Sequence, residues 1–352
     1  MTALKDRIAA QIAAQGPISV ADYMSIANAF YYATRDPLGH AGDFITAPEI
    51  SQVFGEMLGL WCVQVWHDQG RCARKRLVEL GPGRGTLMAD ALRAARVAPE
   101  FLDGLDVVLV ESSPALRQAQ QERLREWGGL IRWSDRFDSS LGDRALFLLA
   151  NEFFDALPIR QYVRTMRGWR ERMVRLTGDK LDFALSPVPV PDAAIPPGRS
   201  DAPDGGVCEI CPSALALADE IAHVVAVQGG GALIVDYGYD TPGFGETLQA
   251  VADHSFAGIL DDPGESDLSA HVDFAALASA ASRATVSGPD TQAEFLDDIG
   301  IVRRFEQLAS RNAAKAGELW SQLDRLVNPE RMGTLFKALA ITPRGAPTPP
   351  GF

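Results

Sequence analysis

The chain has 352 residues, of which 47% are hydrophobic, and its formal net charge is −13. This length and apolar content suit one large α/β domain with additions, or two domains. The acidic balance disfavours nucleic acid and anionic membranes as partners, because both need a basic face. No run of about eighteen apolar residues is present that would span a bilayer.

Four cysteines in a chain of this length do not suggest a disulfide framework. Cys208 and Cys211 form a single CxxC with no second pair, so we interpret both as packing residues and not as metal ligands. The N-terminal segment MTALKDRIAAQIAAQG lacks the apolar core of a signal peptide, and it is too short and too acidic for a transit peptide. We therefore expect a soluble, cytoplasmic protein.

The N-terminal region predicts two helices. Apolar residues recur at every fourth position from Leu4 to Ile12, and Gly16 and Pro17 stop this pattern. A second helical segment follows Ser19 and runs to about residue 33.

A glycine-bearing loop, residues 39–49, comes next and ends in Thr46 and Glu49. These two residues fit the N-cap and the partner of a capping box for the helix that begins at residue 50. Asp43 has no such structural explanation. It is either a turn residue or a residue that faces a ligand.

The stretch RLVELGPGRGTLMAD, residues 76–90, predicts a strand, a glycine-rich turn and a helix. Gly81, Gly83 and Gly85 permit positive φ angles and let a ligand approach the backbone. The spacing G-P-G-R-G differs from the G-x-G-x-x-G of dinucleotide sites, and Glu79 precedes the first glycine by two residues. This glycine spacing, with an acid on the strand before it, suits a nucleoside that carries a sulfonium and an amino acid. A tight turn that binds no ligand is the simpler alternative.

Two further acids follow predicted strands. Residues 105–110, LDVVLV, predict a buried parallel strand that ends in Glu111, where a carboxylate can hold a ribose diol. Capping of the next helix by Glu111 is the alternative, and Ser113 is a further candidate for cofactor contact. Asp135 follows a third strand, residues 129–133, and is either a contact to the adenine edge or a solvated loop acid.

A fourth strand, residues 145–150, runs directly into NEFFDALP. Asn151, Glu152 and Asp155 therefore lie at the carboxyl end of a parallel strand, which is the edge where open sheets bind ligands. A strand-exit turn capped by Asp155 would also explain this cluster. We prefer a site in which Glu152 faces a cationic ligand.

Beyond residue 158 the sequence contains short runs in which apolar and polar residues alternate. Residues 159–185 predict an antiparallel meander whose arginines form a solvated face or, alternatively, a docking surface for an acidic partner. Residues 186–206 form a proline-rich loop that we expect to be too irregular to belong to a core. A helix and a fifth strand, residues 232–238, follow.

The C-terminal third supplies one more candidate site residue. Residues 247–274 predict mostly loop and bring Asp267, His271 and Asp273 close together in sequence, with too few donors for a metal. His271 is either a structural histidine or a site residue beside a carboxylate. A last strand is predicted at residues 335–341.

In chain order, the motifs GDFITAPEISQVFGEMLG, VELGPGRGTLMAD, VESSP, NEFFDALP, VDYGY, DLSAHVDF and MGTLFKALAI resemble those of the MidA-like S-adenosylmethionine-dependent methyltransferases. These are relatives of the mitochondrial respiratory complex I assembly methyltransferase. The resemblance extends from about residue 18 to residue 342. It implies an α/β class I methyltransferase fold, Rossmann-like, with a seven-stranded, mostly parallel sheet and one reversed strand.

The same resemblance implies a division of the chain into four segments. We expect an N-terminal helical cap over the cofactor site at 1–70 and the first half of the Rossmann-like core at 71–158. The inserted β-meander and proline-rich loop would occupy 159–206, and the second half of the core, with substrate-side loops, would occupy 207–352.

The resemblance also implies roles for individual residues. The glycines would line the methionine part of S-adenosylmethionine, Glu111 would hold its ribose, and Glu152 would bind a guanidinium. The candidate cofactor contacts are Thr46, Glu79, Gly81, Gly83, Gly85, Glu111, Ser113, Asp135 and Asn151. The candidate catalytic residues are Glu152, Asp155 and His271, and no metal is expected.

By this similarity we expect a protein arginine N-methyltransferase that acts on a subunit of complex I or a related protein. A non-catalytic, S-adenosylmethionine-binding assembly factor for complex I is the alternative. An NAD-dependent oxidoreductase is a third possibility, which the glycine spacing disfavours. The expected partner is a protein substrate, without nucleic acid or membrane insertion, and the oligomeric state is open.

Overall fold

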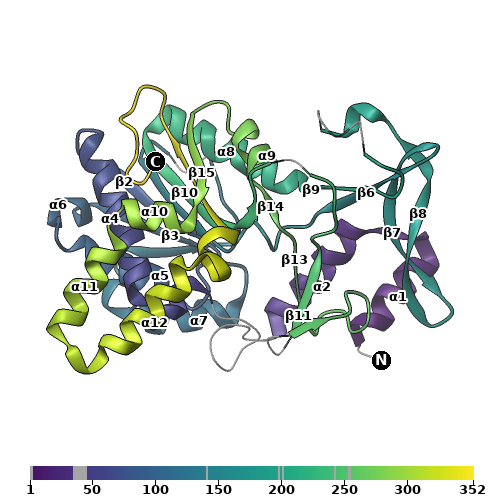
Figure 1. The fold of residues 1–352 in the computed structure, drawn as a ribbon, viewed down its shortest axis with the longest axis horizontal. Coiled ribbons are helices and arrows are strands. Elements are labelled where there is room, and N and C mark those ends of the chain that lie inside the picture. Colours follow the sequence, from purple (N-terminus) through teal and green to yellow (C-terminus); the bar gives the residue numbers. More distant parts are fainter. Residues whose placement is uncertain are drawn as a thin grey trace. The chain divides into compact units, whose positions relative to one another are not determined.

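The computed structural model describes residues 3–34, 46–139, 142–196, 199, 202–241, 243–252 and 255–352. The chain forms two compact units, each assembled from segments that are far apart in sequence (Figure 1). Unit 1 comprises Met1–Phe44, Asp155–Leu215 and Tyr239–Ala275, and unit 2 comprises Ile45–Phe154, Ala216–Gly238 and Ala276–Phe352. Asp43 lies outside the described residues.

Unit 2 is an α/β structure built on a mixed sheet. The sheet has eight strands in all, and seven of them follow the path β15-β16-β10-β5-β2-β3-β4. Their bounds are β2 (Lys75–Leu80), β3 (Leu105–Val110), β4 (Ile131–Ser134), β5 (Ala145–Asn151), β10 (Gly230–Tyr239), β15 (Thr285–Thr291) and β16 (Phe336–Thr342). The strands from β4 to β10 pair in parallel, whereas β16 is antiparallel to both β10 and β15.

Helices connect and cover these strands. In chain order they are α3 (Ala47–Ile50), α4 (Gln52–Asp68), α5 (Thr86–Ala95), α6 (Pro99–Leu102), α7 (Pro114–Arg123), α8 (Pro212–Gln228), α9 (Phe274–Ala280), α10 (Gln292–Asp298), α11 (Ile301–Arg311) and α12 (Ala316–Val327). Short helical turns lie at Arg125–Trp127, Ala313–Lys315 and Pro329–Gly333. None of the helices in the described ranges is long and apolar enough to cross a bilayer.

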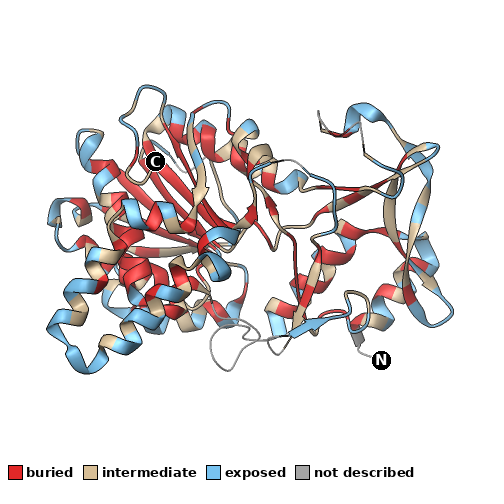
Figure 2. Ribbon diagram, viewed as in Figure 1, coloured by how far each residue is buried: buried red, intermediate tan, exposed pale blue. Residues whose placement is uncertain are grey.

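The centre of the sheet is buried along its whole length, as the apolar runs of parallel strands predict (Figure 2). Helix α4 lies close to α5 because two glycines of α4 face α5. A Cβ added to Gly59 would lie 2.5 Å from the Cα of Ala91, and one added to Gly55 would lie 2.8 Å from the Cβ of Asp90. This close packing fixes α5, whose first residue follows the glycine turn.

In the parts of unit 1 that the structure describes there are two α-helices, a short helical turn (Asp192–Ala194) and two small antiparallel sheets. The helices are α1 (Ala3–Gln15) and α2 (Val20–Thr34), and their apolar faces form a core that contains Ile8, Tyr23 and Val174. The larger sheet consists of β1 (Ile18–Ser19), β6 (Arg160–Thr165), β7 (Gly168–Thr177), β8 (Lys180–Val190) and β9 (Val207–Ile210). The pairs β6–β7 and β7–β8 are antiparallel and join consecutive strands.

Two sequence-based expectations differ from this structure, and one strand had no counterpart in them. The segment 247–274, expected to be mostly loop, contains β11 (Gln249–Ala252), β12 (Ser255–Ala257), β13 (Asp267–Ser269) and β14 (Val272–Asp273), which are too short to give a periodic pattern. Strand β15 was not expected, because Gly288 and Pro289 in its centre resemble a turn and coincide with a shift in register. In the proline-rich loop, Ile195 and Arg199 are buried.

Candidate functional site

The glycine turn after β2 has the conformation that its sequence predicts. Gly81, Gly83 and Gly85 have φ angles of 61°, 52° and 77°, in the left-handed region that favours glycine. A Cβ on Gly81 would lie 2.8 Å from the ring of Phe153. The N–H of Gly81 donates to the carbonyl of Val110 at 3.1 Å, which ties the turn to the end of β3.

A residue that the sequence did not single out fixes the shape of this turn. Gln120 of α7 is fully buried, and its Nε2 donates to the carbonyl oxygen of Gly83 at 2.7 Å. Its Oε1 accepts from the indole N–H of Trp133 at 2.8 Å. One feature of the sequence could have indicated its burial. Gln120 lies four residues after Leu116, on the buried face of the helix.

Two buried acceptor atoms lie at the carboxyl ends of neighbouring strands. Glu79 Oε2 and Asn151 Oδ1 receive no hydrogen bond from any described residue. Because Glu79 pairs with Leu149 in the β2–β5 register, and side chains alternate along a strand, Glu79 and Asn151 project from the same face. Burial raises the pKa of Glu79 to about 8, although the N–H of Met88 partly opposes this shift.

Glu111 directly follows β3 and belongs to the same edge of the sheet. Its carboxylate accepts from the N–H of Ser113 at 2.7 Å and from Gln120 Nε2 at 3.4 Å. Burial raises its pKa, and these hydrogen bonds lower it in part. The helix cap is Ser113, whose hydroxyl accepts from the N–H of Leu116, so Glu111 is not the cap of α7.

Asp135 is more exposed to solvent than the other candidate acids at this edge of the sheet. Its side chain is 82% exposed and forms an ion pair of 2.6 Å with Arg117. The same arginine donates through its Nε to the carbonyl of Glu111 at 2.8 Å. Asp135 is thus connected to the edge of the sheet through Arg117, at the solvent boundary.

Glu152 is held in an unusual backbone conformation, with a φ of 52°. Its Oε1 accepts from the N–H of Ala47 at 2.9 Å. Thr46 is the N-cap of α3 but makes no side-chain cap bond, and Glu49 Oε1 instead accepts from the Thr86 hydroxyl. Thr46 is therefore the N-cap, as the structural alternative had it, but Glu49 is not its capping-box partner, since the carboxylate of Glu49 is bound at the start of α5.

Asp236, in the second half of β10, shapes the turn that carries Glu152. It is fully buried, and its Oδ2 accepts from the N–H groups of Phe153 at 3.1 Å and Phe154 at 2.9 Å. Its Oδ1 accepts from the N–H of Tyr237 at 2.9 Å. Asp236 falls within the predicted fifth strand, residues 232–238, and no sequence pattern indicates which backbone groups it binds.

The other two candidate catalytic residues belong to unit 1. The carbonyl oxygen of Asp155 accepts from the N–H of Ala270 at 3.0 Å, which brings Asp155 beside the segment of His271. The N–H of His271 donates to the hydroxyl of Thr247 at 2.9 Å. Burial lowers the pKa of His271, and the carboxylate of Glu209 partly opposes this shift.

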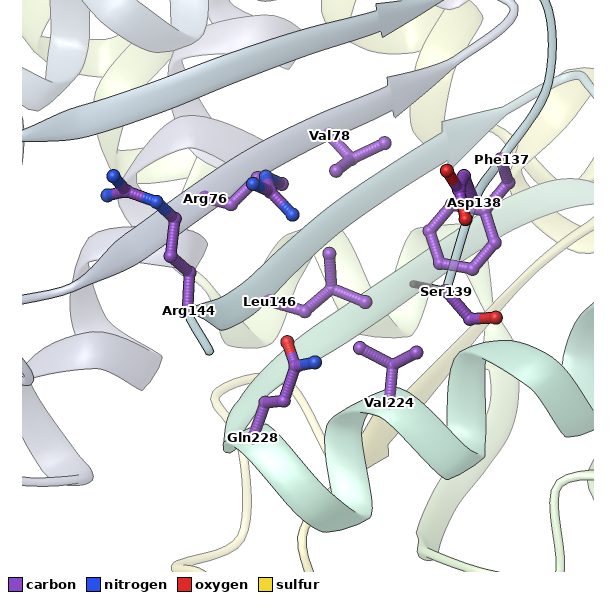
Figure 3. Close-up of a pocket in the computed structure, with 9 residues that line it drawn as sticks. All are labelled: Arg76, Val78, Phe137, Asp138, Ser139, Arg144, Leu146, Val224 and Gln228. Carbon is purple, nitrogen blue, oxygen red and sulfur yellow. The ribbon is translucent and has the colours of Figure 1, made fainter. Parts of the chain in front are cut away.

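A small pocket in unit 2 lies elsewhere (Figure 3). It is lined by Arg76 and Val78 of β2, by Leu146 of β5 and by the C-terminal part of α8. Arg76 and Leu146 are near the amino ends of their strands, whereas the glycine turn follows a carboxyl end. The pocket is therefore separate from the predicted site. The described residues contain no cluster of three or more potential metal ligands.

Comparisons with known proteins give consistent results. A family described as "Putative S-adenosyl-L-methionine-dependent methyltransferase" matches residues 57–289. The proteins named "Protein arginine methyltransferase NDUFAF7, mitochondrial" from Danio rerio and Homo sapiens are each 37% identical to this chain over 95% of its length, and cover 85% and 82% of their own lengths. A crystal structure described as a "likely methyl transferase from Burkholderia thailandensis bound to S-adenosyl-homocysteine" superposes with a TM-score of 0.87 at 27% identity, covering 99% of this chain and 94% of that one.

These comparisons correct one expectation. The sequence led us to expect a cytoplasmic protein, but the relatives from Danio rerio, Homo sapiens and Rattus norvegicus are all named as mitochondrial. The cytoplasmic assignment is therefore wrong. It rested on the cysteines, which suggest no disulfide framework, and on the composition of the N-terminal segment, and neither feature determines a compartment.

Proposed function

The chain belongs to the S-adenosylmethionine-dependent methyltransferase family, and we propose that it methylates arginine side chains of a protein. We propose further that this protein is a subunit of respiratory complex I or a related protein. The observation that carries this proposal is the 37% identity, over 95% of the chain, to relatives named as protein arginine methyltransferases. The chain is a methyltransferase, and its cofactor is S-adenosylmethionine. The nature of the acceptor is the part that we infer.

We also propose that the seven-strand path of unit 2 is a class I methyltransferase core. Its single reversed strand, β16, supports this assignment. On this interpretation, the segments 1–70 and 159–206 are additions to the core. Unit 2, which contains all nine candidate cofactor contacts, would bind the cofactor.

The residues at the carboxyl edge of the sheet fit S-adenosylmethionine. The orphaned oxygens of Glu79 and Asn151 can accept from its ammonium group, which would supply the missing donors. The left-handed glycines shape a tight turn after β2, and Glu111 offers a carboxylate for a ribose diol. Bound there, the cofactor supplies a methyl group that is already activated by a sulfonium. We assign supporting contacts to Thr46, Ser113 and Asp135.

The chain itself must then orient the acceptor and remove a proton. A guanidinium has a pKa above about 12 and is protonated in water, so a carboxylate is needed to align it and localise its charge. We assign this task to Glu152, whose carboxylate is fixed by the N–H of Ala47. Asp155 and His271 are the candidate proton acceptors, and the lowered pKa of His271 keeps its imidazole neutral and able to accept.

Label transfer tests this proposal. The purified protein is incubated with S-adenosylmethionine labelled in its methyl group and with a complex I subunit fraction, and the products are analysed by mass spectrometry. We expect label on arginine side chains, and its loss in Glu152→Gln. Label only on nucleic acid or small molecules would overturn the protein-arginine assignment, and cofactor binding without any transfer would favour the assembly factor.

A further inference from the structure

Helix α2 carries a buried asparagine that binds two separate segments of unit 1. Asn28 Nδ2 donates to the carbonyl oxygens of Leu268 at 2.8 Å and Ala156 at 3.2 Å. Its Oδ1 accepts from the N–H of Leu268 at 3.1 Å. Ala156 follows Asp155 directly, so one amide connects the chain beside a candidate catalytic acid to strand β13.

One turn farther along α2, a tyrosine binds the same strand through its side chain. The hydroxyl of Tyr32 donates to Asp267 Oδ1 at 2.8 Å. Burial of the hydroxyl, together with the nearby carboxylates of Asp267 and Asp155, raises the pKa of Tyr32 well above its usual range. The phenol is therefore always a hydrogen-bond donor at physiological pH.

The two segments are also joined directly, where the N–H of Ala270 donates to the carbonyl of Asp155 at 3.0 Å. His271 is the next residue in the chain. Asp155 and Asp267 are 8% and 7% exposed, and buried carboxylates need hydrogen-bond donors next to them. The geometry of both candidate proton acceptors thus depends on bonds that originate in α2.

We propose that Tyr32 and Asn28 are positioning residues of the methyl-acceptor side of the reaction: they hold the Asp155 segment and the 267–271 segment in register, so that Asp155 and His271 meet the guanidinium of the acceptor correctly. This inference rests on the proposed function, because it assigns these residues to arginine methylation. It differs from a role in cofactor binding, since every bond involved lies in unit 1.

The test uses substitutions that remove single bonds. Tyr32→Phe removes the donor to Asp267 and keeps the ring, and Asn28→Asp keeps the acceptor for Leu268 but replaces the donating NH2 with an oxygen. Tyr23→Phe is the matched control, because Tyr23 lies on the same helix and its hydroxyl donates at 2.6 Å to the carbonyl of Ile259 instead. All three variants lose buried hydrogen bonds, so a general loss of stability affects the control as well.

For Tyr32→Phe and Asn28→Asp we expect kcat/KM for an arginine-containing protein acceptor to fall at least about tenfold, as misplacement of a reacting group predicts. The Kd for S-adenosylhomocysteine should change by less than about twofold, and Tyr23→Phe should leave both constants within about twofold. Wild-type activity with unchanged kinetics in both variants would overturn the inference and leave the proposed function intact.

Amide hydrogen exchange separates this inference from the proposed function. Without any assayable acceptor, Tyr32→Phe should still accelerate exchange of the Leu268 and Ala270 amides at least about tenfold, and Tyr23→Phe should not. Unaltered exchange at these two amides would overturn the positioning role. Accelerated exchange in Tyr32→Phe, together with a wild-type protein that methylates no protein, would support the positioning role and contradict only the acceptor assignment.

Discussion

The carboxylate of Glu152 and the backbone N–H of Ala47 are joined by a hydrogen bond of 2.9 Å. This bond connects the turn after β5 to the first residue of α3, and Asn151 adds a second donor to the same oxygen at 3.0 Å. Glu152 also has a φ of 52°, a conformation that costs a non-glycine residue about 1 kcal/mol. The surrounding bonds therefore fix this carboxylate before any substrate arrives.

Glu152→Gln should reduce turnover by about 100-fold or more, because an amide cannot neutralise and align a guanidinium. Glutamine keeps the Oε1 that accepts from Ala47 and Asn151, so the fold and the Kd for S-adenosylhomocysteine should change little. Steady-state kinetics and calorimetric titration measure the two quantities. Turnover within about threefold of wild type would remove Glu152 from the mechanism.

Gly81→Ala should weaken cofactor binding at least about tenfold. The added Cβ would lie 2.8 Å from the Phe153 ring, at a φ of 61° that strains alanine by about 1 kcal/mol. Gly104→Ala is the control, because Gly104 has a φ of 65° with no atom near the added Cβ. The control should lose only the stability that the strain costs, about 1 kcal/mol, and should bind S-adenosylhomocysteine normally. Equal binding by the two variants would argue against a ligand at the turn.

Glu79 should make the protein less stable as the pH rises. Its pKa is about 8 in the folded protein and 4.5 as an isolated group, so between these values the folded state retains a proton that the unfolded state has released. The free energy of unfolding should therefore fall with pH in this window, by at most about 1.4 kcal/mol per pH unit from this group. Urea unfolding of wild type and Glu79→Gln at pH 5.5 and 7.5 measures the difference. A wild-type pH dependence equal to that of the variant would contradict a buried, protonated Glu79.

Asp236→Asn should destabilise unit 2 by about 1–3 kcal/mol, because the amide nitrogen replaces one of the two carboxylate oxygens and cannot accept. Either the bonds from Phe153 and Phe154 or the bond from Tyr237 is then lost. The turn with Glu152 should loosen, so turnover should fall more than cofactor affinity. Denaturant unfolding and kinetics measure both effects. A variant as stable as wild type would show that these bonds are dispensable.

The sequence predicted those parts of the molecule whose causes are local. The left-handed glycines at 81, 83 and 85, the strand before them and the helix from Thr86 all follow from residue type and spacing. Long apolar strands such as β3 and β5 were also predictable, because parallel strands buried on both faces need continuous apolar runs.

The remaining features depend on partners that are distant in sequence. Glu49 was assigned to Thr46, three residues away, yet its hydrogen bond is to Thr86. Asn28 and Gln120 act through carbonyl groups far along the chain, so no local pattern marks them. Strand β15 was missed because a glycine and a proline interrupt its pattern, and its antiparallel pairing is with β16, about 50 residues farther along the chain.

A crystal structure with S-adenosylhomocysteine tests the central claim most directly. We predict density against the turn at residues 81–85, with the amino group of the ligand beside the orphaned oxygens of Glu79 and Asn151 and the ribose hydroxyls on Glu111. Density away from this turn, for example in the pocket lined by Arg76 and Gln228, would contradict the account.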